Sequence, residues 1–369
     1  MECLHGRIVM AELFKDLYNT QYIQLLATNI TKKYPTFQHT AFKQAIFNTS
    51  WNEYELKDRM HHISTILGDF LPKEYKKAID ILSLIFTNMN NSYGLENMIF
   101  QDFVEVYGLD SFDVSMRALE IFTVNSSSEF AIRQFLIQEE QRTMKQMLVW
   151  AKSENEHIRR LASEGCRPRL PWAIALPVFK GDPTLVLEVL ELLKDDTSAY
   201  VRKSVANNLN DISKDNPEIV KKLTKEWLGF SKERDSMLKH GCRTLLKASD
   251  SEVLALFGFT KPVNITLQNF VHTSCVNIGE ELEFSFDICS SQTLGKLRIE
   301  FIMGFLRKNG KQNKKVFKIA EGTYAQKTKA VSKTYSFRPI STRVYYKGEQ
   351  SLSILINGVV FKEISFKLT

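Results

Sequence analysis

Apolar residues recur at helical spacing through most of the first 260 positions of the chain. In residues 11–26 they fall on one face of an α-helix, at Leu13, Phe14, Leu17, Ile23 and Leu26. Residues 51–71 and 73–86 repeat this pattern, and a proline at position 72 separates the two segments. The pattern predicts a succession of amphipathic helices.

A loose internal repeat follows within this helical region. Three segments share a polar start, an apolar residue, a basic residue and a small residue, and their basic positions are Arg159, Arg202 and Lys239. Spacings of about 40 to 47 residues with two or three helices per unit are typical of HEAT and armadillo repeats. Residues 183–193 and 217–228 supply the first helix of each pair. Because one helix pair cannot bury its apolar face alone, we expect residues 1–260 to form a curved HEAT-like α-helical solenoid. A generic helical bundle is the alternative.

The pattern changes near residue 259, where alternation of apolar and polar residues replaces the helical period. Residues 281–288 read ELEFSFDI, which predicts a strand with one buried face. Asn-Gly pairs at 309–310 and 357–358 are typical of hairpin turns. Further strands are expected at 297–306, 315–319, 334–337, 351–356 and 359–366. We expect residues 261–369 to form an all-β immunoglobulin-like sandwich, joined through a short linker at Lys261-Pro262.

The composition is that of a globular protein. Of the 369 residues 44% are hydrophobic and 25% charged, and no apolar run reaches the roughly 18 residues of a membrane span. The first ten residues lack the apolar core of a signal peptide, and the five cysteines form no pair or cluster with metal-ligand spacing. We expect a cytoplasmic protein with reduced thiols, and neither a metal site nor a cofactor.

Charge is distributed unevenly along the chain. Residues 261–369 contain 17 Lys and Arg against 8 Asp and Glu, whereas the whole chain has a formal net charge of +7. The predicted sandwich therefore carries the basic surplus. Such a surplus suits a polyanion, most often nucleic acid, although a surface kept basic for solubility is the alternative.

The segment 154–172, ENEHIRRLASEGCRPRLPW, concentrates the chemically informative side chains. Arg160 and Glu164 are four residues apart, so a helix brings them into contact, usually as a surface salt bridge worth under about 1 kcal/mol. Residues 166–172 add a basic loop that ends in Trp172. Phosphate anchors beside an aromatic surface are what a nucleic-acid site needs, with a plain structural role as the alternative. Cys166 beside Arg167 could be a nucleophile, but a packed thiol is the better interpretation.

The run HIRRLASEGCRPRLPWA, followed by AYVRKSVANNLNDIS, resembles the AlkC family of bacterial DNA glycosylases, relatives of AlkD. The resemblance extends over the whole chain and includes the C-terminal Ig-like domain of one AlkC branch. It implies an enzyme that hydrolyses the N-glycosidic bond of the N3-alkylated bases 3-methyladenine and 3-methylcytosine in double-stranded DNA. It also implies that the base is not flipped into a pocket.

The family pattern, matched position by position, implies five catalytic residues: Glu164, Trp172, Glu129, Asp211 and Arg160. An alkylated base is cationic and leaves readily, so the enzyme must stabilise positive charge on the deoxyribose and hold a water molecule. The resemblance assigns these tasks to Glu164 and Glu129. Trp172 would pack on the sugar and supply π density.

Asp211 would orient a phosphate-binding group or the water, and Arg160 would keep Glu164 ionised or contact DNA. Read without the resemblance, Glu129 fits the first turn of a capped helix and Asp211 a solvated helix end. Trp172 then fits a packed aromatic residue.

Contacts to DNA are expected from basic and amide side chains near the repeats and from a basic loop at the first Asn-Gly turn. These residues are Arg167, Arg169, Arg202, Lys203, Asn207, Asn208, Lys239, Arg243, Arg307, Lys308 and Lys311, with Lys314 and Lys315 beside the same loop. Such side chains neutralise phosphates without reading sequence, which suits a scanner for damage. The loop could also be merely solvated.

Two other functions fit the sequence. One is a non-catalytic HEAT scaffold that binds nucleic acid or another protein, and the other is a protein-interaction module that uses its Ig-like domain. A scaffold would tolerate Glu164→Gln without loss of function, whereas a glycosylase would not. We expect a monomer that binds double-stranded DNA containing alkylated bases and does not associate with membranes.

Overall fold

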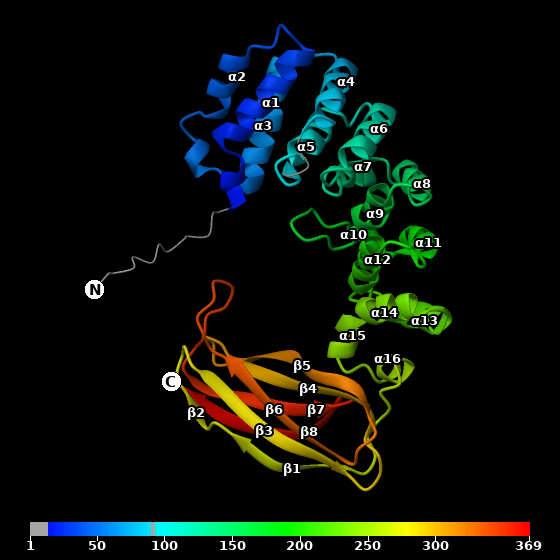
Figure 1. Ribbon diagram of the computed structural model, residues 1–369, viewed down its shortest axis with the longest axis vertical. Coiled ribbons are helices and arrows are strands. Elements are labelled where there is room, and N and C mark those ends of the chain that lie inside the picture. Colours follow the sequence, from blue (N-terminus) through cyan, green and yellow to red (C-terminus); the bar gives the residue numbers. More distant parts are fainter. Residues whose placement is uncertain (1–13, 90–92) are drawn as a thin grey trace, which may run out of the picture. The chain divides into compact units, whose positions relative to one another are not determined.

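The computed structural model describes residues 14–89 and 93–369 (Figure 1). The chain divides into two compact units, Met1–Asp215 and Asn216–Thr369. The described part of the first unit is helical, and the second unit contains further helices followed by all the strands. The predicted fold class, a HEAT-like helical region followed by an all-β Ig-like sandwich, is confirmed.

The described part of the first unit is a succession of helices joined by loops, and one of these loops, residues 166–176, carries Trp172. The helices are η1 Phe14–Leu17, α1 Thr20–Lys33, α2 His39–Ile46, η2 Trp51–Glu53, α3 Leu56–Phe70, α4 Tyr75–Phe86, α5 Met98–Tyr107, α6 Phe112–Phe122, α7 Ile132–Gln138, α8 Glu140–Trp150, α9 Glu156–Gly165, α10 Pro177–Gly181, α11 Thr184–Leu193 and α12 Ala199–Ile212. The helix expected over 11–26 is divided into η1 and α1, and its first three residues lie outside the described residues, as do the first ten positions.

Helices α9 and α12 pack against each other, and both contribute residues to the site. Both begin at a polar cap position, and the Asn155 side chain accepts a hydrogen bond from the His157 amide at 2.8 Å. Their apolar faces are fully buried, as shown by Leu161 on α9 and by Val201 and Val205 on α12. The polar positions of the same helices are therefore fixed relative to one another.

Two of the three repeated basic residues, Arg159 and Arg202, make the same kind of contact, and Lys239 does not. Arg159 donates to the carbonyls of residues 153 and 154, and Arg202 donates to those of residues 196 and 197. Each arginine thus ties down the turn that precedes its own helix. Arg159 also pairs with Asp196 of the next repeat at 2.6 Å. Arg159 and Arg202 each lie four residues after their helix caps, Asn155 and Ser198, whereas Lys239 lies eight residues after its cap, Ser231. The predicted equivalence of Lys239 with the two arginines is therefore wrong.

The second unit contains four helices and a two-sheet sandwich. Its elements are α13 Pro217–Trp227, α14 Lys232–Gly241, α15 Arg243–Lys247, α16 Ser251–Leu256, β1 Ile265–His272, β2 Cys275–Val276, β3 Glu281–Ser290, β4 Gly295–Leu306, β5 Gln312–Tyr324, β6 Thr328–Ser336, β7 Gly348–Ile356 and β8 Val359–Leu368. The sheets have the strand orders β1-β3-β6 and β2-β8-β7-β4-β5. Their inner faces share one apolar core that includes Phe284, Phe286 and Phe301.

The two predicted hairpins form with different turns. Asn357 and Gly358 both have positive φ, as a two-residue turn between β7 and β8 requires. At the other turn only Gly310 has positive φ, and its amide binds the Arg307 carbonyl at 2.9 Å, which closes a three-residue loop. Strands β1 and β2 were not predicted, because β2 has two residues and β1 contains a bulge after Gln268 that interrupts the alternation.

Helices of the second unit pack on its sandwich. Lys239 of α14 forms an ion pair with Glu321 of β5, and the Asn357 side chain donates to the Thr260 carbonyl at 2.8 Å. The division into compact units therefore lies at residues 215 and 216, within the run of helices. The boundary expected after residue 260 coincides with the change from helix to strand, since α16 ends at Leu256 and β1 begins at Ile265.

Candidate active site in the first unit

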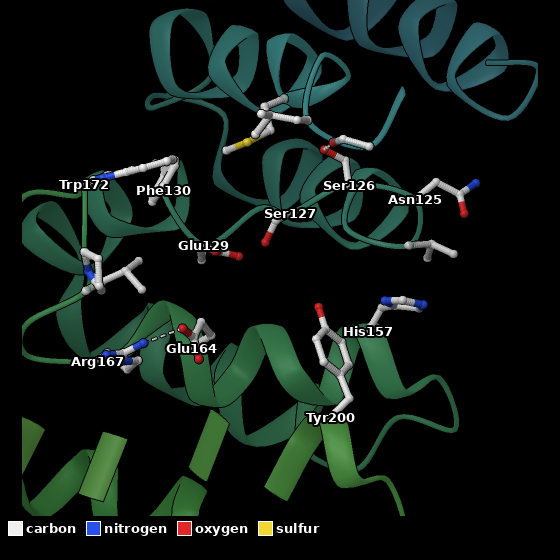
Figure 2. A pocket seen from close by; sticks show the side chains of 16 residues that line it. Asn125, Ser126, Ser127, Glu129, Phe130, His157, Glu164, Arg167, Trp172 and Tyr200 are labelled. Atoms are coloured by element: carbon white, nitrogen blue, oxygen red, sulfur yellow. Dashed lines mark hydrogen bonds and ion pairs between the residues drawn. The ribbon is translucent and has the colours of Figure 1, made fainter. Parts of the chain in front are cut away.

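A pocket of about 730 Å³ opens in the first unit between α9, α12 and the segment before α7. Its lining includes two carboxylates, Glu129 and Glu164, and two pairs of aromatic rings. Figure 2 shows Trp172 and Phe130 on one side and His157 and Tyr200 on the other, with both carboxyl groups between them. The pocket therefore combines negative charge with π surfaces.

Glu164 is anchored through both of its carboxylate oxygens. It lies in the last turn of α9, is only 5% exposed and still reaches the pocket wall. One carboxylate oxygen accepts from Arg167 at 2.6 Å (Figure 2), and the other accepts from the Ser204 hydroxyl at 2.6 Å. Arg160 lies 3.7 Å away, as the spacing of four residues predicts. An ionised carboxylate can accept further bonds, so its remaining lone pairs are available to a ligand.

Arg167 joins this acid to a second, deeper one. Its Nε donates to Asp211 at 2.9 Å, while its Nη1 holds Glu164. Asp211 is 1% exposed, also binds Lys214 at 2.9 Å, and does not line the pocket. Buried charges of this kind are tolerated only when paired. Arg167 therefore lines the pocket while it pairs with both acids, and this geometry favours a role in fixing Glu164 over the expected phosphate contact.

Glu129 enters the pocket from the opposite side, just before α7. It forms a two-pronged ion pair with Arg160, which also donates to Ser127 at 2.7 Å. Burial raises the pKa of Glu129, the Arg160 charge lowers it, and nearby Glu164 adds to the rise. Burial lowers the pKa of Arg160, but the two carboxylates outweigh this effect and keep it raised. Arg160 thus stays cationic between the two acids.

Trp172 lines the pocket, and the residue is 64% exposed. Its backbone φ is 64°, in the left-handed region that bulky residues rarely adopt. The residue is therefore not the packed aromatic that its position after Pro171 would otherwise suggest. An exposed ring in a fixed backbone conformation is suited to contact a ligand.

His157 and Tyr200 form an aromatic pair that the sequence interpretation did not assign to the site. Their rings meet edge-to-face at 5.7 Å, and Arg160 lies 5.2 Å from the Tyr200 ring. Both residues occupy the second position after a helix cap, Asn155 in α9 and Ser198 in α12. This shared position in consecutive repeats was the available signal, because equivalent positions of stacked repeats lie side by side.

Two other residues of the central segment are structural. Cys166 is fully buried, and burial raises the pKa of its thiol to about 12, which argues against a nucleophile. Asn208 is also fully buried and donates to the Ser163 carbonyl at 2.8 Å. The direct DNA contact expected of Asn208 is therefore wrong, since its amide has no exposed surface.

The remaining predicted DNA contacts lie on or near the surface of their units. In the first unit, Arg169 forms a two-pronged pair with Asp215 at 2.6 and 2.9 Å, and Lys203 is exposed while Asn207 is half-buried. Arg202 is half-buried, and its guanidinium binds backbone carbonyls. In the second unit, Lys239 and Arg243 are half-buried. The loop residues Arg307, Lys308 and Lys311 are exposed, as are Lys314 and Lys315 at the start of β5.

In residues 14–89 and 93–369, no group of three metal-ligating side chains is close enough to hold an ion. Among the helices of the same residues, none has the length and apolarity needed to cross a bilayer.

Comparisons with known proteins agree along nearly the whole chain. A family model described as DNA alkylation repair enzyme matches residues 119–240, and one described as the C-terminal Ig-like domain of protein YhaZ matches residues 267–369. The chain is 42% identical to the uncharacterised protein YhaZ of Bacillus subtilis, over 97% of this chain and all of that protein. It is also similar to the Pseudomonas fluorescens alkylpurine DNA glycosylase AlkC, in a structure bound to DNA containing an abasic site analogue. The identity is 32%, the TM-score is 0.92, and the match covers 97% of this chain and all of that one.

Proposed function

Because the chain belongs to the AlkC/YhaZ-type family of DNA alkylation repair glycosylases, we propose that it hydrolyses the N-glycosidic bond of N3-alkylated bases. The proposed substrates are 3-methyladenine and 3-methylcytosine in double-stranded DNA. The AlkC structure with abasic DNA supports DNA as the partner. The proposal includes a monomeric enzyme that works on the chromosome in the cytoplasm.

The chemistry requires negative charge more than it requires an acid. Alkylation at a ring nitrogen gives the base a positive charge, so the base departs without being protonated. As the bond breaks, positive charge builds on the deoxyribose, and a water molecule must then attack its C1′ atom. Preorganised carboxylates stabilise such a charge without reorganising during the reaction. The enzyme needs these carboxylates ionised and facing the sugar.

Glu164 and Glu129 fit that requirement. Glu164 is fixed by Arg167 and Ser204 at 2.6 Å each, yet still lines the pocket. We assign to it the stabilisation of the sugar cation, and we assign to Glu129, across the pocket, the positioning of water. Arg160 lies between the two acids and holds their carboxylates in place by charge. Asp211 acts indirectly, because it fixes Arg167, which in turn binds Glu164.

Trp172 supplies the aromatic surface. Its exposed side chain, which lines the pocket, is suited to pack on the deoxyribose and stabilise positive charge there. This arrangement supports recognition of the lesion from the sugar side, without flipping of the base. A 2-aminopurine placed beside the lesion should therefore show no rise in fluorescence on binding, whereas a rise would contradict this part of the proposal.

The observation that carries the proposal is a buried, doubly anchored Glu164 at the wall of a pocket that an exposed tryptophan also lines. The test is single-turnover release of the base from duplexes with one 3-methylcytosine or one 3-methyladenine. We expect Glu164→Gln to slow release by about 100- to 1,000-fold. Glu188→Gln, at an exposed position of α11, is the matched control and should keep the wild-type rate.

Binding to a duplex with an abasic analogue must be measured beside the rate. Retained binding with lost release places Glu164 in the chemical step. If the wild type binds DNA but releases no alkylated base, the catalytic proposal is wrong and a binding scaffold takes its place. Release of one base but not the other defines the substrate class.

A further inference from the structure

The loop that carries Trp172 is held in an unfavourable backbone conformation. With φ at 64°, Trp172 lies where the side chain of an L-residue crowds its own carbonyl. Its ring is mostly exposed, so packing of that ring does not supply the compensation. Contacts elsewhere in the loop must therefore keep the backbone in this state.

Arg133 provides one such contact from beneath the loop. This residue of α7 is fully buried, and its guanidinium donates to the carbonyls of Gly165 and Arg167, both at 2.9 Å, and of Ile174 at 2.6 Å. It therefore joins the two ends of the loop. These three hydrogen bonds of Arg133 do not include the backbone of Trp172 itself.

Lys57 binds that backbone directly. It lies in the first turn of α3 and is 115 positions away in the sequence, and its ammonium group donates to the Trp172 carbonyl. The same ammonium group is 4.6 Å from the centre of the Phe130 ring, which lines the active-site pocket beside Trp172. A cation in the first turn of a helix opposes the helix dipole, so α3 itself gains nothing from this lysine.

The surroundings of Lys57 explain why it stays at the loop. A second cavity, of about 760 Å³, is lined by Lys57, Asp102 and Glu105 together with Phe130 and Ile174. Burial raises the pKa of both acids, and the charge of Lys57 acts against that rise. Carboxylates, an aromatic face and a carbonyl thus all attract the ammonium group to one place.

We propose that Lys57 is a positioning residue of the glycosylase: it clamps the Trp172 carbonyl and so presents the indole ring to the deoxyribose. The inference rests on the proposed function and deepens it, because it assigns a role to a residue that does not line the active-site pocket. Lys57 acts through Trp172, and Arg133 holds the ends of the same loop.

The test is a double-mutant cycle with Lys57→Met and Trp172→Ala, read by single-turnover release of 3-methylcytosine. Lys57→Met should slow release about tenfold in the wild-type background, which corresponds to about 1.4 kcal/mol, and should have no further effect in the Trp172→Ala background. Lys57→Arg keeps a donor and should retain most of the rate. Lys76→Met, an exposed lysine of α4, is the matched control and should be silent.

Two further readouts separate this role from the alternatives. Affinity for an abasic-analogue duplex and its salt dependence should not change in Lys57→Met, whereas a lysine that touches phosphate would reduce the salt slope by about one. The emission of Trp172, taken as the difference between each protein and its Trp172→Ala counterpart, should change in Lys57→Met and be restored in Lys57→Arg.

The outcomes are distinct. Equal slowing by Lys57→Met in both backgrounds, a reduced salt slope, or unchanged Trp172 emission overturns the inference while leaving the proposed function intact. Full activity of Trp172→Ala overturns both the role of Trp172 and that of Lys57. If the wild type releases no base, the proposed function fails, and the emission measurement still decides whether Lys57 holds the loop.

Discussion

Replacing Arg167 by methionine distinguishes its two possible roles. The sequence suggests a phosphate anchor, but the side chain of this residue is 7% exposed and pairs with two acids whose side chains are 7% and 2% exposed. Methionine keeps much of the length and removes the charge. Glu164 and Asp211 would then lose their shared partner while remaining inside the protein.

The loss of stability depends on which partners Glu164 and Asp211 retain in the variant. Breaking a buried ion pair by removing one partner costs about 3 to 5 kcal/mol, because a charge is left uncompensated. Glu164 would keep Ser204 at 2.6 Å and Arg160 at 3.7 Å, and Asp211 would keep Lys214 at 2.9 Å. We therefore expect the lower end, a loss of about 3 kcal/mol in the free energy of unfolding of the first unit.

Urea unfolding followed by circular dichroism measures this loss, with an expected drop of about 1 to 2 M in the midpoint of the helical transition. Adding Asp211→Asn to Arg167→Met removes one stranded charge and should recover part of the stability. Arg169→Met is the matched control, since Arg169 pairs with Asp215 near the surface. An unchanged midpoint together with weaker, less salt-dependent DNA binding would refute this reasoning and restore the phosphate contact.

Two further predictions concern pH and the sandwich. Burial raises the pKa of Glu129, so base release should fall as the pH drops through that raised value and the carboxylate becomes neutral. Glu129→Gln should release the base more slowly than the wild type at every pH, and its plot of single-turnover rate against pH should lack this fall at low pH. If the variant shows the same fall as the wild type, Glu129 is not the group that titrates. Lys308→Gln with Lys311→Gln should weaken binding to damaged and undamaged duplex alike and reduce the salt slope by about two, whereas an unchanged slope means a merely solvated loop.

Much of the fold was accessible from sequence because it rests on local signals. Helical periodicity and alternation are properties of short windows, and they distinguished the helical region from the strands. The Asn357-Gly358 turn formed as predicted because two positive φ values favour those residues. Strand β1 was missed because a bulge breaks its alternation.

The site was less predictable because its contacts are tertiary. The spacing of Arg160 and Glu164 placed them on one helix face, but the closest partner of Arg160 is Glu129, 31 residues away. Burial of Arg167 depends on Asp211, 44 residues away, so a basic loop in the sequence became an internal clamp in the structure. The left-handed backbone of Trp172 has no sequence signal, since tryptophan avoids that region.

The position of the unit boundary bears on how such proteins can be recombined in evolution. Phe259 is 1% exposed, and its ring has the ammonium groups of Lys239 and Lys296 at 4.9 and 5.2 Å. A gene fusion that transferred the strands alone would leave Glu321 without its helical partner, and a lineage that lost them would expose this ring. Residues 216–369 therefore pack as one compact unit, and relatives without the sandwich should carry compensating changes at Lys239 and Phe259.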